Sequence, residues 1–241
     1  MDERVPEIRK HLKKKLDPMR YEHTLGVSYT CQALAMRYGY DLDKAELAGL
    51  LHDCAKRYDG ETLLSKCLAR NLQVTPSEER DPSLLHAKLG AYMAREKYGV
   101  EDPEILQAIE CHTTGRCGMT LLDKILYAAD YIEPRRYKAG NLPEMRKLAF
   151  LDLDEACLAI MESTLTYLRS REFSIDTATV LACEDMKRAV EEKRKHIKIQ
   201  DIKNQMESKE ETAFETVKRA GENRRRGIVR EKRRRYKNYR H

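Results

Sequence analysis

Apolar residues recur at the spacing of an amphipathic helix along most of this chain, whereas the alternation typical of strands is almost absent. The first apolar stripe consists of Val5, Ile8, Leu12 and Leu16, and it ends at Asp17-Pro18. The pattern therefore predicts an all-α fold. Further helices are predicted through His23 to about residue 38, over 43–56, 61–70, 83–98, 103–112, 120–133, 144–151 and 153–170, and from about residue 178 onward.

Some of the predicted helix ends coincide with residues that favour such positions. Gly39 follows an apolar stripe and is expected to end its helix, because glycine readily adopts the left-handed conformation of a C-terminal cap. Asp43 is expected to cap a helix that runs through Lys56. Pro134 is expected to end another helix, so residues 135–143 are predicted to form a loop.

The charge of the chain is distributed unevenly along its length. Residues 187–241 hold 20 Lys and Arg against 9 Asp and Glu, whereas residues 1–186 hold 26 against 31. The overall charge of +6 is thus a property of the C-terminal part. We predict a folded domain over residues 1–186 and a basic extension over 187–241 that is partly helical and then disordered.

The most basic segment offers a second kind of function, as a binding protein. Residues 222–241 hold 10 Lys and Arg against 2 Asp and Glu, with Tyr236 and Tyr239 interleaved. Such a segment could contact RNA or the ribosome through phosphates and occasional stacking. A solvated disordered tail is the simpler interpretation, and tail binding would be compatible with catalysis by the domain.

Cysteine usage and hydropathy bear on where the protein works. The seven cysteines are scattered and show no disulfide framework, which favours a reducing compartment. No apolar run approaches the length of a membrane span, and the first residues lack a signal core. We therefore expect a cytoplasmic protein with no membrane partner.

Five short polar words interrupt the apolar helices: His23, His52-Asp53, His86, His112 and Asp130. Leu-Ala-Gly-Leu-Leu runs into the His-Asp pair, and Ile-Leu-Tyr-Ala-Ala runs into the last aspartate. Ionised carboxylates are costly in such surroundings unless a charge or a metal ion compensates them. One histidine on an apolar face is usually a hydrogen-bonded core residue, but that explanation has to hold five times here. We predict one internal metal site assembled from several helices.

The candidate metal ligands are His23, His52, Asp53 and Asp130. Two imidazoles and two carboxylates suit iron, manganese, cobalt or zinc better than calcium. An ion with these four ligands keeps positions for water and for a substrate oxygen, and it lowers the pKa of bound water from about 15.7 toward about 7. The sequence therefore predicts a metal-dependent hydrolase.

Three further residues are expected near the ion. Lys56 is predicted one turn beyond the His-Asp pair on the same helix face, where its ammonium could neutralise a bound phosphate. His86 and His112 could bind phosphate oxygens or hold a second metal ion, so one or two ions are expected. The residues alone do not decide between these roles.

Two other segments could bind phosphate. Thr113 opens a Thr-Thr-Gly-Arg loop with exposed amides and hydroxyls, although many such loops are only turns. Arg136 follows the helix of Asp130 past a proline, where its guanidinium could clamp a phosphate through two hydrogen bonds.

Longer words surround these residues, namely Arg20-Tyr-Glu-His-Thr-Leu-Gly-Val, Ala48-Gly-Leu-Leu-His-Asp-Cys-Ala-Lys, Leu85-His-Ala, His112-Thr-Thr-Gly-Arg and Lys124-Ile-Leu-Tyr-Ala-Ala-Asp-Tyr-Ile-Glu-Pro. In this order they resemble one branch of the HD-domain metal-dependent phosphohydrolases, the bacterial YqeK-type symmetrical bis(5'-nucleosyl)-tetraphosphatases. The resemblance covers about residues 5–180.

The resemblance implies a helical HD-domain bundle that holds iron and hydrolyses diadenosine tetraphosphate into two ADP. Metal-bound hydroxide would attack an inner phosphorus, with Asp53 and Lys56 in catalytic roles. By motif position, the metal ligands would be the four residues named above. The nucleotide would be held by His23, Lys56, His86, His112, Thr113, Arg136, Ser174, Ile175, Asp176 and Thr177.

This chain departs from the family pattern at two places, and the sequence leaves two questions open. Ile175 stands where a proline is expected, and Leu181-Ala182-Cys183 replaces an Ala-Arg-Asn-like word, so base and ribose contacts are less well supported. The alternative is an HD nucleotidase or phosphodiesterase that acts on another nucleotide. The sequence leaves the oligomeric state open, with a dimer as one option.

Overall fold

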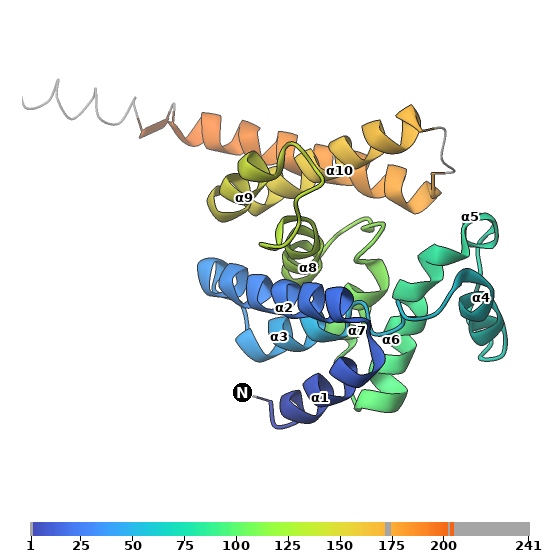
Figure 1. Cartoon of the computed structure of the whole chain (residues 1–241). Coiled ribbons are helices and arrows are strands. Elements are labelled where there is room, and N and C mark those ends of the chain that lie inside the picture. The colour runs from blue at the N-terminus through green and yellow to red at the C-terminus, as the bar shows by residue number, and fades with distance from the viewer. Residues whose placement is uncertain (1, 172–174, 202, 205–241) are drawn as a thin grey trace, which may run out of the picture. The chain divides into compact units, whose positions relative to one another are not determined.

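The computed structural model describes residues 2–171, 175–201 and 203–204, and the chain divides into two units, Met1–Val190 and Glu191–His241. The described residues form helices, turns and loops, and no strand occurs among them (Figure 1). The predicted all-α fold is confirmed. Within the described ranges, no helix has both the length and the apolar character needed to cross a membrane.

The first unit is built from short and medium-length helices. Residues 177–190 form its last helix, and in the second unit residues 191–201 and 203–204 are helical. The labelled helices are α1 Val5–Lys15, α2 Pro18–Tyr38, α3 Leu42–Leu51, α4 Gly60–Leu68, α5 Pro76–Arg80, the 3-10 helix η1 Pro82–Leu84, α6 Leu85–Tyr98, α7 Pro103–Cys111, α8 Leu121–Ile132, α9 Leu142–Leu151 and α10 Leu153–Ser170.

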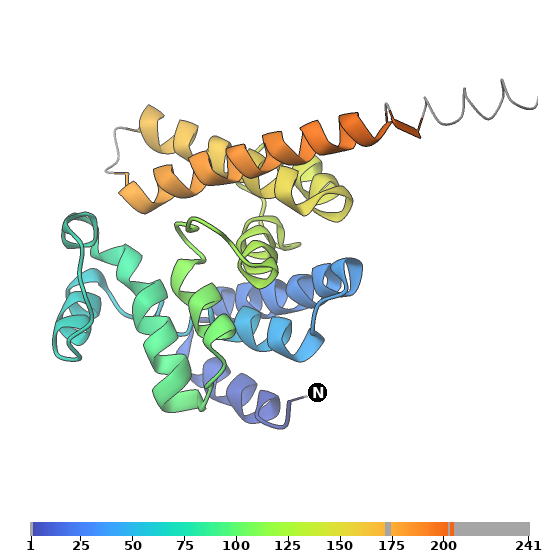
Figure 2. The same ribbon diagram turned by 180° about the vertical axis from the view of Figure 1, so that it is seen from behind.

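Helix α8 lies inside the first unit, between the α2–α3 pair and the α9–α10 pair (Figures 1 and 2). Its Leu122, Ile125 and Leu126 are fully buried, which explains why its sequence is apolar on nearly every side. Helix α2 packs against α3 and α8, and α6 packs against α7 and α4. Helices α3, α7 and α8 also pack against one another.

Local chemistry accounts for the helix boundaries around α2 and α3. Asp17 caps α2 by accepting a hydrogen bond from the Arg20 backbone N–H, and Gly39 ends α2 in the left-handed conformation with φ of 68°. Asp41, not Asp43, caps α3 by accepting from the Lys44 backbone N–H. The prediction of Asp43 as the cap was therefore wrong by two residues.

The prediction of one helix through Lys56 was also wrong. Helix α3 ends at Leu51, and residues 52–57 form tight turns in which the Cys54 N–H donates to the Leu51 carbonyl and the Lys56 N–H donates to the Asp53 carbonyl. Consecutive residues on a regular helix point about 100° apart. The turns instead allow His52 and Asp53, which are 0 and 3% exposed, to face the interior together.

The sequence pattern also missed α5, which lies with η1 between α4 and α6, and it merged residues 83–84 of η1 with α6. Helix α5 is too short for apolar periodicity to reveal, but it carries a capping box in which Thr75 and Glu78 satisfy each other's backbone N–H groups. A Ser/Thr-x-x-Glu word was the available signal for this element.

Replacing Gly49 by alanine is expected to destabilise the fold by about 2–3 kcal/mol, because the added Cβ would lie 2.6 Å from Ser28 Cα where α2 and α3 pack. Urea unfolding followed by circular dichroism measures this. Gly140→Ala is the matched control, since its Cβ meets nothing within 4 Å, and it should change stability by less than about 0.5 kcal/mol. Equal stability of the two variants would contradict close α2–α3 packing.

Candidate metal centre and active site

Four histidines from different elements meet in the interior of the first unit. His23 lies on α2, His52 directly after α3, His86 in the first turn of α6 and His112 directly after α7. All four are buried, and their ring centroids form a chain with steps of 5.5, 5.1 and 5.1 Å. The structure thus brings together all the histidines that the sequence singled out.

Each ring has an oxygen atom beside its Nδ1. His52 Nδ1 lies 2.7 Å from the Gly49 carbonyl oxygen, and His112 Nδ1 lies 2.7 Å from that of Ile109. In the other two rings, Nδ1 lies 2.5 Å from the Ser83 carbonyl oxygen for His86 and 3.1 Å from Glu133 Oε1 for His23. We assign a proton to Nδ1 in each ring because the three carbonyl oxygens and the Glu133 carboxylate beside them only accept. The Nε2 atoms are then left to face the centre.

Two carboxylates stand among these Nε2 atoms. Asp130 Oδ1 lies 3.0 Å from His23 Nε2 and 3.9 Å from His52 Nε2. Asp53 has one oxygen toward each end of the histidine chain. Its Oδ2 lies 3.5 Å from His52 Nε2, and its Oδ1 lies 3.3 Å from His86 Nε2 and 3.8 Å from His112 Nε2.

This arrangement fits a metal ion by its donor set and by its unsatisfied atoms. His23, His52 and Asp130 form one group of donor atoms within 4.8 Å of one another, and His52, Asp53 and His112 form another. The buried His52 Nε2 has no hydrogen-bond partner in the described part of the chain, and the buried His23 Nε2 has the Asp130 carboxylate beside it at 3.0 Å. Such atoms are costly, and a cation bound between them would satisfy both.

The charge state of His23 shows how strongly this position attracts a cation. Burial lowers its pKa, but the neighbouring carboxylates of Asp130 and Glu133 outweigh burial and raise the pKa to about 9. Burial raises the pKa of Asp130, while His23 and the Arg136 charge bring it well below its ordinary value. A bound metal ion would replace the proton on His23.

The other end of the histidine chain favours neutral rings. Burial is the main cause that lowers the pKa of His86 to about 3, and His112 lowers it further. Burial likewise lowers the pKa of His112. A neutral ring whose Nδ1 carries the proton has a lone pair at Nε2, so these two atoms are suited to accept a proton or a metal ion.

Three cations line the centre. Arg20 NH1 lies 2.7 Å from Asp53 Oδ2, and Arg136 NH2 lies 2.7 Å from Asp130 Oδ1. Lys56 Nζ lies 3.5 Å from His86 Nε2, so Lys56 reaches the site although it is not on a helix. Arg20 and Arg136 also line a cavity of about 590 Å³ that opens beside His23 and Asp130.

The loop after α7 contributes one residue to the site and another to the stability of the fold. Thr113 Oγ1 lies 3.2 Å from His112 Nε2 and 3.3 Å from His86 Nε2. Arg116 instead pairs with the fully buried Asp123 at 2.7 Å, and it thereby fixes the loop against the start of α8. Thr113 is the loop residue that reaches the centre.

The segment near residue 175 is not brought to the cavity beside His23. Ser174 lies outside the described residues. Ile175 packs against the hydrophobic core, Asp176 accepts a hydrogen bond from the Ala178 N–H at 2.7 Å, and Thr177 is exposed. None of these three lines the cavity, so their contact with nucleotide stays a prediction.

Two residues of the site were missed at the sequence level. Glu133 is 1% exposed and bonds His23, and Arg20 pairs with Asp53. Glu133 lies three residues after Asp130, and Arg20 lies three residues before His23, so each shares a helix face with a predicted ligand. That spacing was the available signal.

Comparison with known proteins agrees with the fold and the centre. Residues 20–135 match the HD domain family, so the helices and the His/Asp centre define an HD-domain protein. The chain is 41% identical over 170 residues to a symmetrical bis(5'-nucleosyl)-tetraphosphatase of Bacillus subtilis, covering 70% of this chain and 90% of that one. It is 44% identical over 160 residues to the protein of that name from Halalkalibacterium halodurans, and the match covers 65% of this chain and 83% of that one.

A solved structure is also similar. It is a predicted HD superfamily hydrolase involved in NAD metabolism from Clostridium acetobutylicum, with a TM-score of 0.74 and 37% identity over 77% of this chain and 97% of that one. The chain belongs to the HD-domain family, in the YqeK-type branch that its Bacillus relatives represent. The resemblance stated from the sequence words is confirmed.

Replacing Glu133 by glutamine is expected to weaken metal binding by about 10- to 100-fold, because the carboxylate that holds His23 Nδ1 orients this ring. Metal content after dialysis against graded chelator measures the change. Glu22→Gln is the control, since Glu22 pairs with Arg135 at the surface. If E133Q kept its metal as tightly as the control does, Glu133 would have no positioning role.

Proposed function

We propose that this protein hydrolyses diadenosine tetraphosphate symmetrically to two ADP. The observation that carries the proposal is the buried His/Asp centre in a chain more than 40% identical to proteins of that activity. The same centre without those relatives would support only a metal-dependent hydrolase. An HD nucleotidase or phosphodiesterase acting on another nucleotide is the less favoured alternative.

We assign His23, His52, Asp53 and Asp130 as ligands of the principal metal ion, which we propose to be iron, with manganese, cobalt or zinc as substitutes. A bound ion would lower the pKa of water and polarise phosphoryl oxygens. Glu133 holds the His23 ring in place, and the Gly49 carbonyl oxygen does the same for His52. The metal-bound geometry thus depends on groups that are already fixed by the fold.

The chain's own cations bind and orient the polyphosphate. Arg20 and Arg136 now pair with Asp53 and Asp130, whose charge a metal ion would share, so both guanidiniums can turn to phosphate oxygens. Lys56 adds a third positive charge, and the Thr113 hydroxyl adds a donor. Together they stabilise charge that develops on the inner phosphates.

Proton transfer is assigned to the interior of the centre. Burial raises the pKa of Asp53, but the neighbouring histidines, His52 foremost, bring it well below its usual value, so its ionised carboxylate would accept a hydrogen bond from the attacking water and orient it. Burial lowers the pKa of Lys56, and the Arg20 charge lowers it further, so its ammonium can share a proton with the departing phosphate. These are the catalytic roles of Asp53 and Lys56.

We further propose that His86 and His112 hold a second metal ion. Their Nε2 atoms lie 3.2 Å apart, and Asp53 Oδ1 lies near both. Neutral rings with the proton on Nδ1 cannot donate from Nε2 to a phosphate oxygen, but they can bind a metal. The lowered pKa values of both rings support this choice over direct phosphate binding.

Chromatography of the products tests the proposed activity. Anaerobically handled protein with iron or manganese is expected to convert diadenosine tetraphosphate to ADP alone, and chelation with EDTA should abolish turnover. His52→Ala and Asp53→Ala should each lower kcat by at least about 1000-fold, because each removes a candidate ligand. Glu22→Gln is the control and should keep full activity.

Three outcomes would contradict this proposal. ATP plus AMP as products would mean asymmetric cleavage, with the polyphosphate bound in another register. Turnover of other nucleotides without any of diadenosine tetraphosphate would favour the alternative HD activity. Full activity of a folded H52A protein would exclude the assigned centre.

Metal analysis tests the second ion. Wild-type protein is expected to hold two ions per chain, and His112→Ala is expected to hold one, because we assign His112 to the second position. Thr113→Val is the control beside it and should keep both ions while raising KM. One ion per chain in both wild type and H112A would instead assign His86 and His112 to phosphate binding.

Some predictions rest on the sequence alone. Residues 222–241 lie outside the described residues, so contact of this segment with RNA or the ribosome stays a prediction. A domain boundary at residue 186, a dimeric state and a cytoplasmic location stay predictions as well.

A further inference from the structure

A second hollow lies along α6, toward the end of this helix that is farther from His86. It measures about 320 Å³ and is lined by one face of α6, on which Leu89, Tyr92, Met93, Glu96 and Lys97 follow helical spacing. The opposite wall comes from the segment between residues 57 and 70. This hollow shares no lining residue with the cavity beside His23.

The walls of this hollow carry four cations, which are Arg57, Lys66, Arg70 and Lys97. Among the described residues, none of them forms an ion pair with a carboxylate within 4.0 Å. Glu96 is the acidic residue of the lining, and its Oε1 already lies 2.8 Å from Arg95 Nε. The hollow therefore concentrates positive charge that the described fold does not balance.

The contacts of these cations are with rings and a backbone carbonyl rather than with acids: Arg70 NH1 donates to the Lys66 carbonyl oxygen at 3.0 Å, and Lys97 Nζ lies 2.7 Å from His11 Nε2. Arg57 and Lys66 lie over the Tyr58 ring at 4.6 and 4.8 Å from its centroid. The Arg57 Nε is buried and has no hydrogen-bond partner in the described ranges. Burial and the Arg57 charge both lower the pKa of Lys97, as expected where like charges lie close together. An anion in the hollow would relieve this repulsion and satisfy the Arg57 donor.

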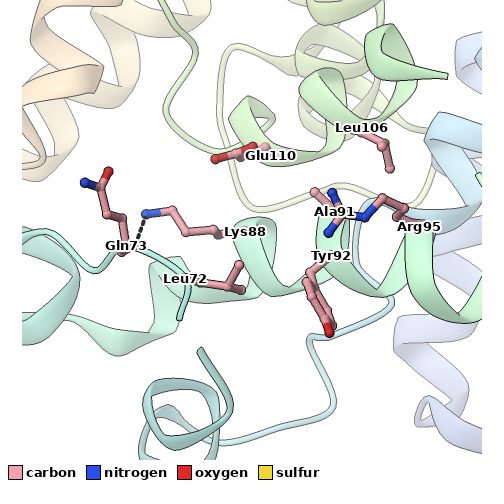
Figure 3. A pocket seen from close by; sticks show the side chains of 8 residues that line it. All are labelled: Leu72, Gln73, Lys88, Ala91, Tyr92, Arg95, Leu106 and Glu110. Carbon is pink, nitrogen blue, oxygen red and sulfur yellow. Dashed lines mark hydrogen bonds between the residues drawn. The ribbon is translucent and has the colours of Figure 1, made fainter. Parts of the chain in front are cut away.

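The neighbouring hollow on the other side of Tyr92 provides an internal comparison (Figure 3). Its cations are already engaged. Lys88 Nζ donates to the Gln73 carbonyl oxygen at 2.6 Å, the bond drawn in Figure 3, and pairs with Glu78 at 2.8 Å. Arg95 pairs with Glu96. The absence of carboxylate partners thus distinguishes the cations of the hollow with Arg57 and Lys66 from those of the neighbouring hollow.

We propose that this hollow binds a nucleoside polyphosphate at a site separate from the metal centre. A chain of three phosphates carries about as many negative charges as the hollow has cations. Tyr92, with the apolar side chains of Leu89 and Met93, offers a surface for the nucleoside, and its ring lies 5.5 Å from the Arg70 guanidinium. A compact cluster of charge favours a free nucleotide over an extended nucleic-acid strand.

The charges of the hollow can be removed without touching the metal centre. Isothermal titration calorimetry of the full chain with inorganic tripolyphosphate, at about 0.15 M salt, compares wild type with the Lys66→Ala/Arg70→Ala double variant. The control is Lys147→Ala/Arg169→Ala, which removes the same charge from exposed positions on α9 and α10. All three proteins keep the basic extension and the metal centre, so non-specific binding is the same in each.

The double variant is expected to lose at least about tenfold in affinity at one class of site, while the control binds as wild type does. ATP should bind wild type more tightly than tripolyphosphate does, and Tyr92→Ala should remove that advantage. Thermal unfolding and diadenosine tetraphosphate hydrolysis, which should be unchanged, show that the variants are folded.

Other results would overturn the site. If K66A/R70A bound tripolyphosphate as the control does, the cations would be solvated surface charges. If ATP and tripolyphosphate bound wild type equally, the hollow would recognise phosphate but no nucleoside. If K66A/R70A lost affinity for a single-stranded RNA of twelve nucleotides but not for tripolyphosphate, the hollow would be part of a nucleic-acid surface instead of a nucleotide site.

Discussion

The rest of this structure depends on six ionisable side chains, five of them buried, that meet at one point of a helical core. Four imidazoles and the carboxylates of Asp53 and Asp130 converge where little water can reach them. Burial of unpaired charge costs several kcal/mol per group, so such a cluster persists only when cations compensate it. Arg20 and Arg136 provide part of that compensation. A metal ion in place of the His23 proton would provide the remainder.

One local device orients three of the four rings. His52, His86 and His112 each bring Nδ1 to the carbonyl oxygen of the residue three positions earlier in the chain. His52 and His112 lie at the ends of α3 and α7, where the last carbonyls have no partner within the helix. The imidazole satisfies such a carbonyl and in return is fixed with Nε2 toward the centre. His23 lies inside α2, where carbonyls are already used, and it is held by Glu133 instead.

The fold also sets how the centre relates to the hollow on α6. The turns at residues 52–57 carry Asp53 at one end and Arg57 at the other, and α6 carries His86 at its start and Lys97 near its end. The turns at residues 52–57 and helix α6 therefore each contribute residues to both the metal centre and the hollow. In the centre, positive charge is paired with carboxylates, whereas in the hollow it is not. The two places thus differ in chemistry although they share supporting structure.

The sequence by itself determined the helical class, most helix positions and the residues of the centre, because apolar periodicity is local and because buried histidines and aspartates stand out against it. The helix at 153–170, for example, is observed as predicted. Only the tertiary structure decided that α3 stops at Leu51, since the burial of His52 and Asp53 on one side overrides helical propensity. It also decided the contacts of Glu133 with His23 and of Arg20 with Asp53, because which buried charges meet depends on how α2, α3 and α8 pack.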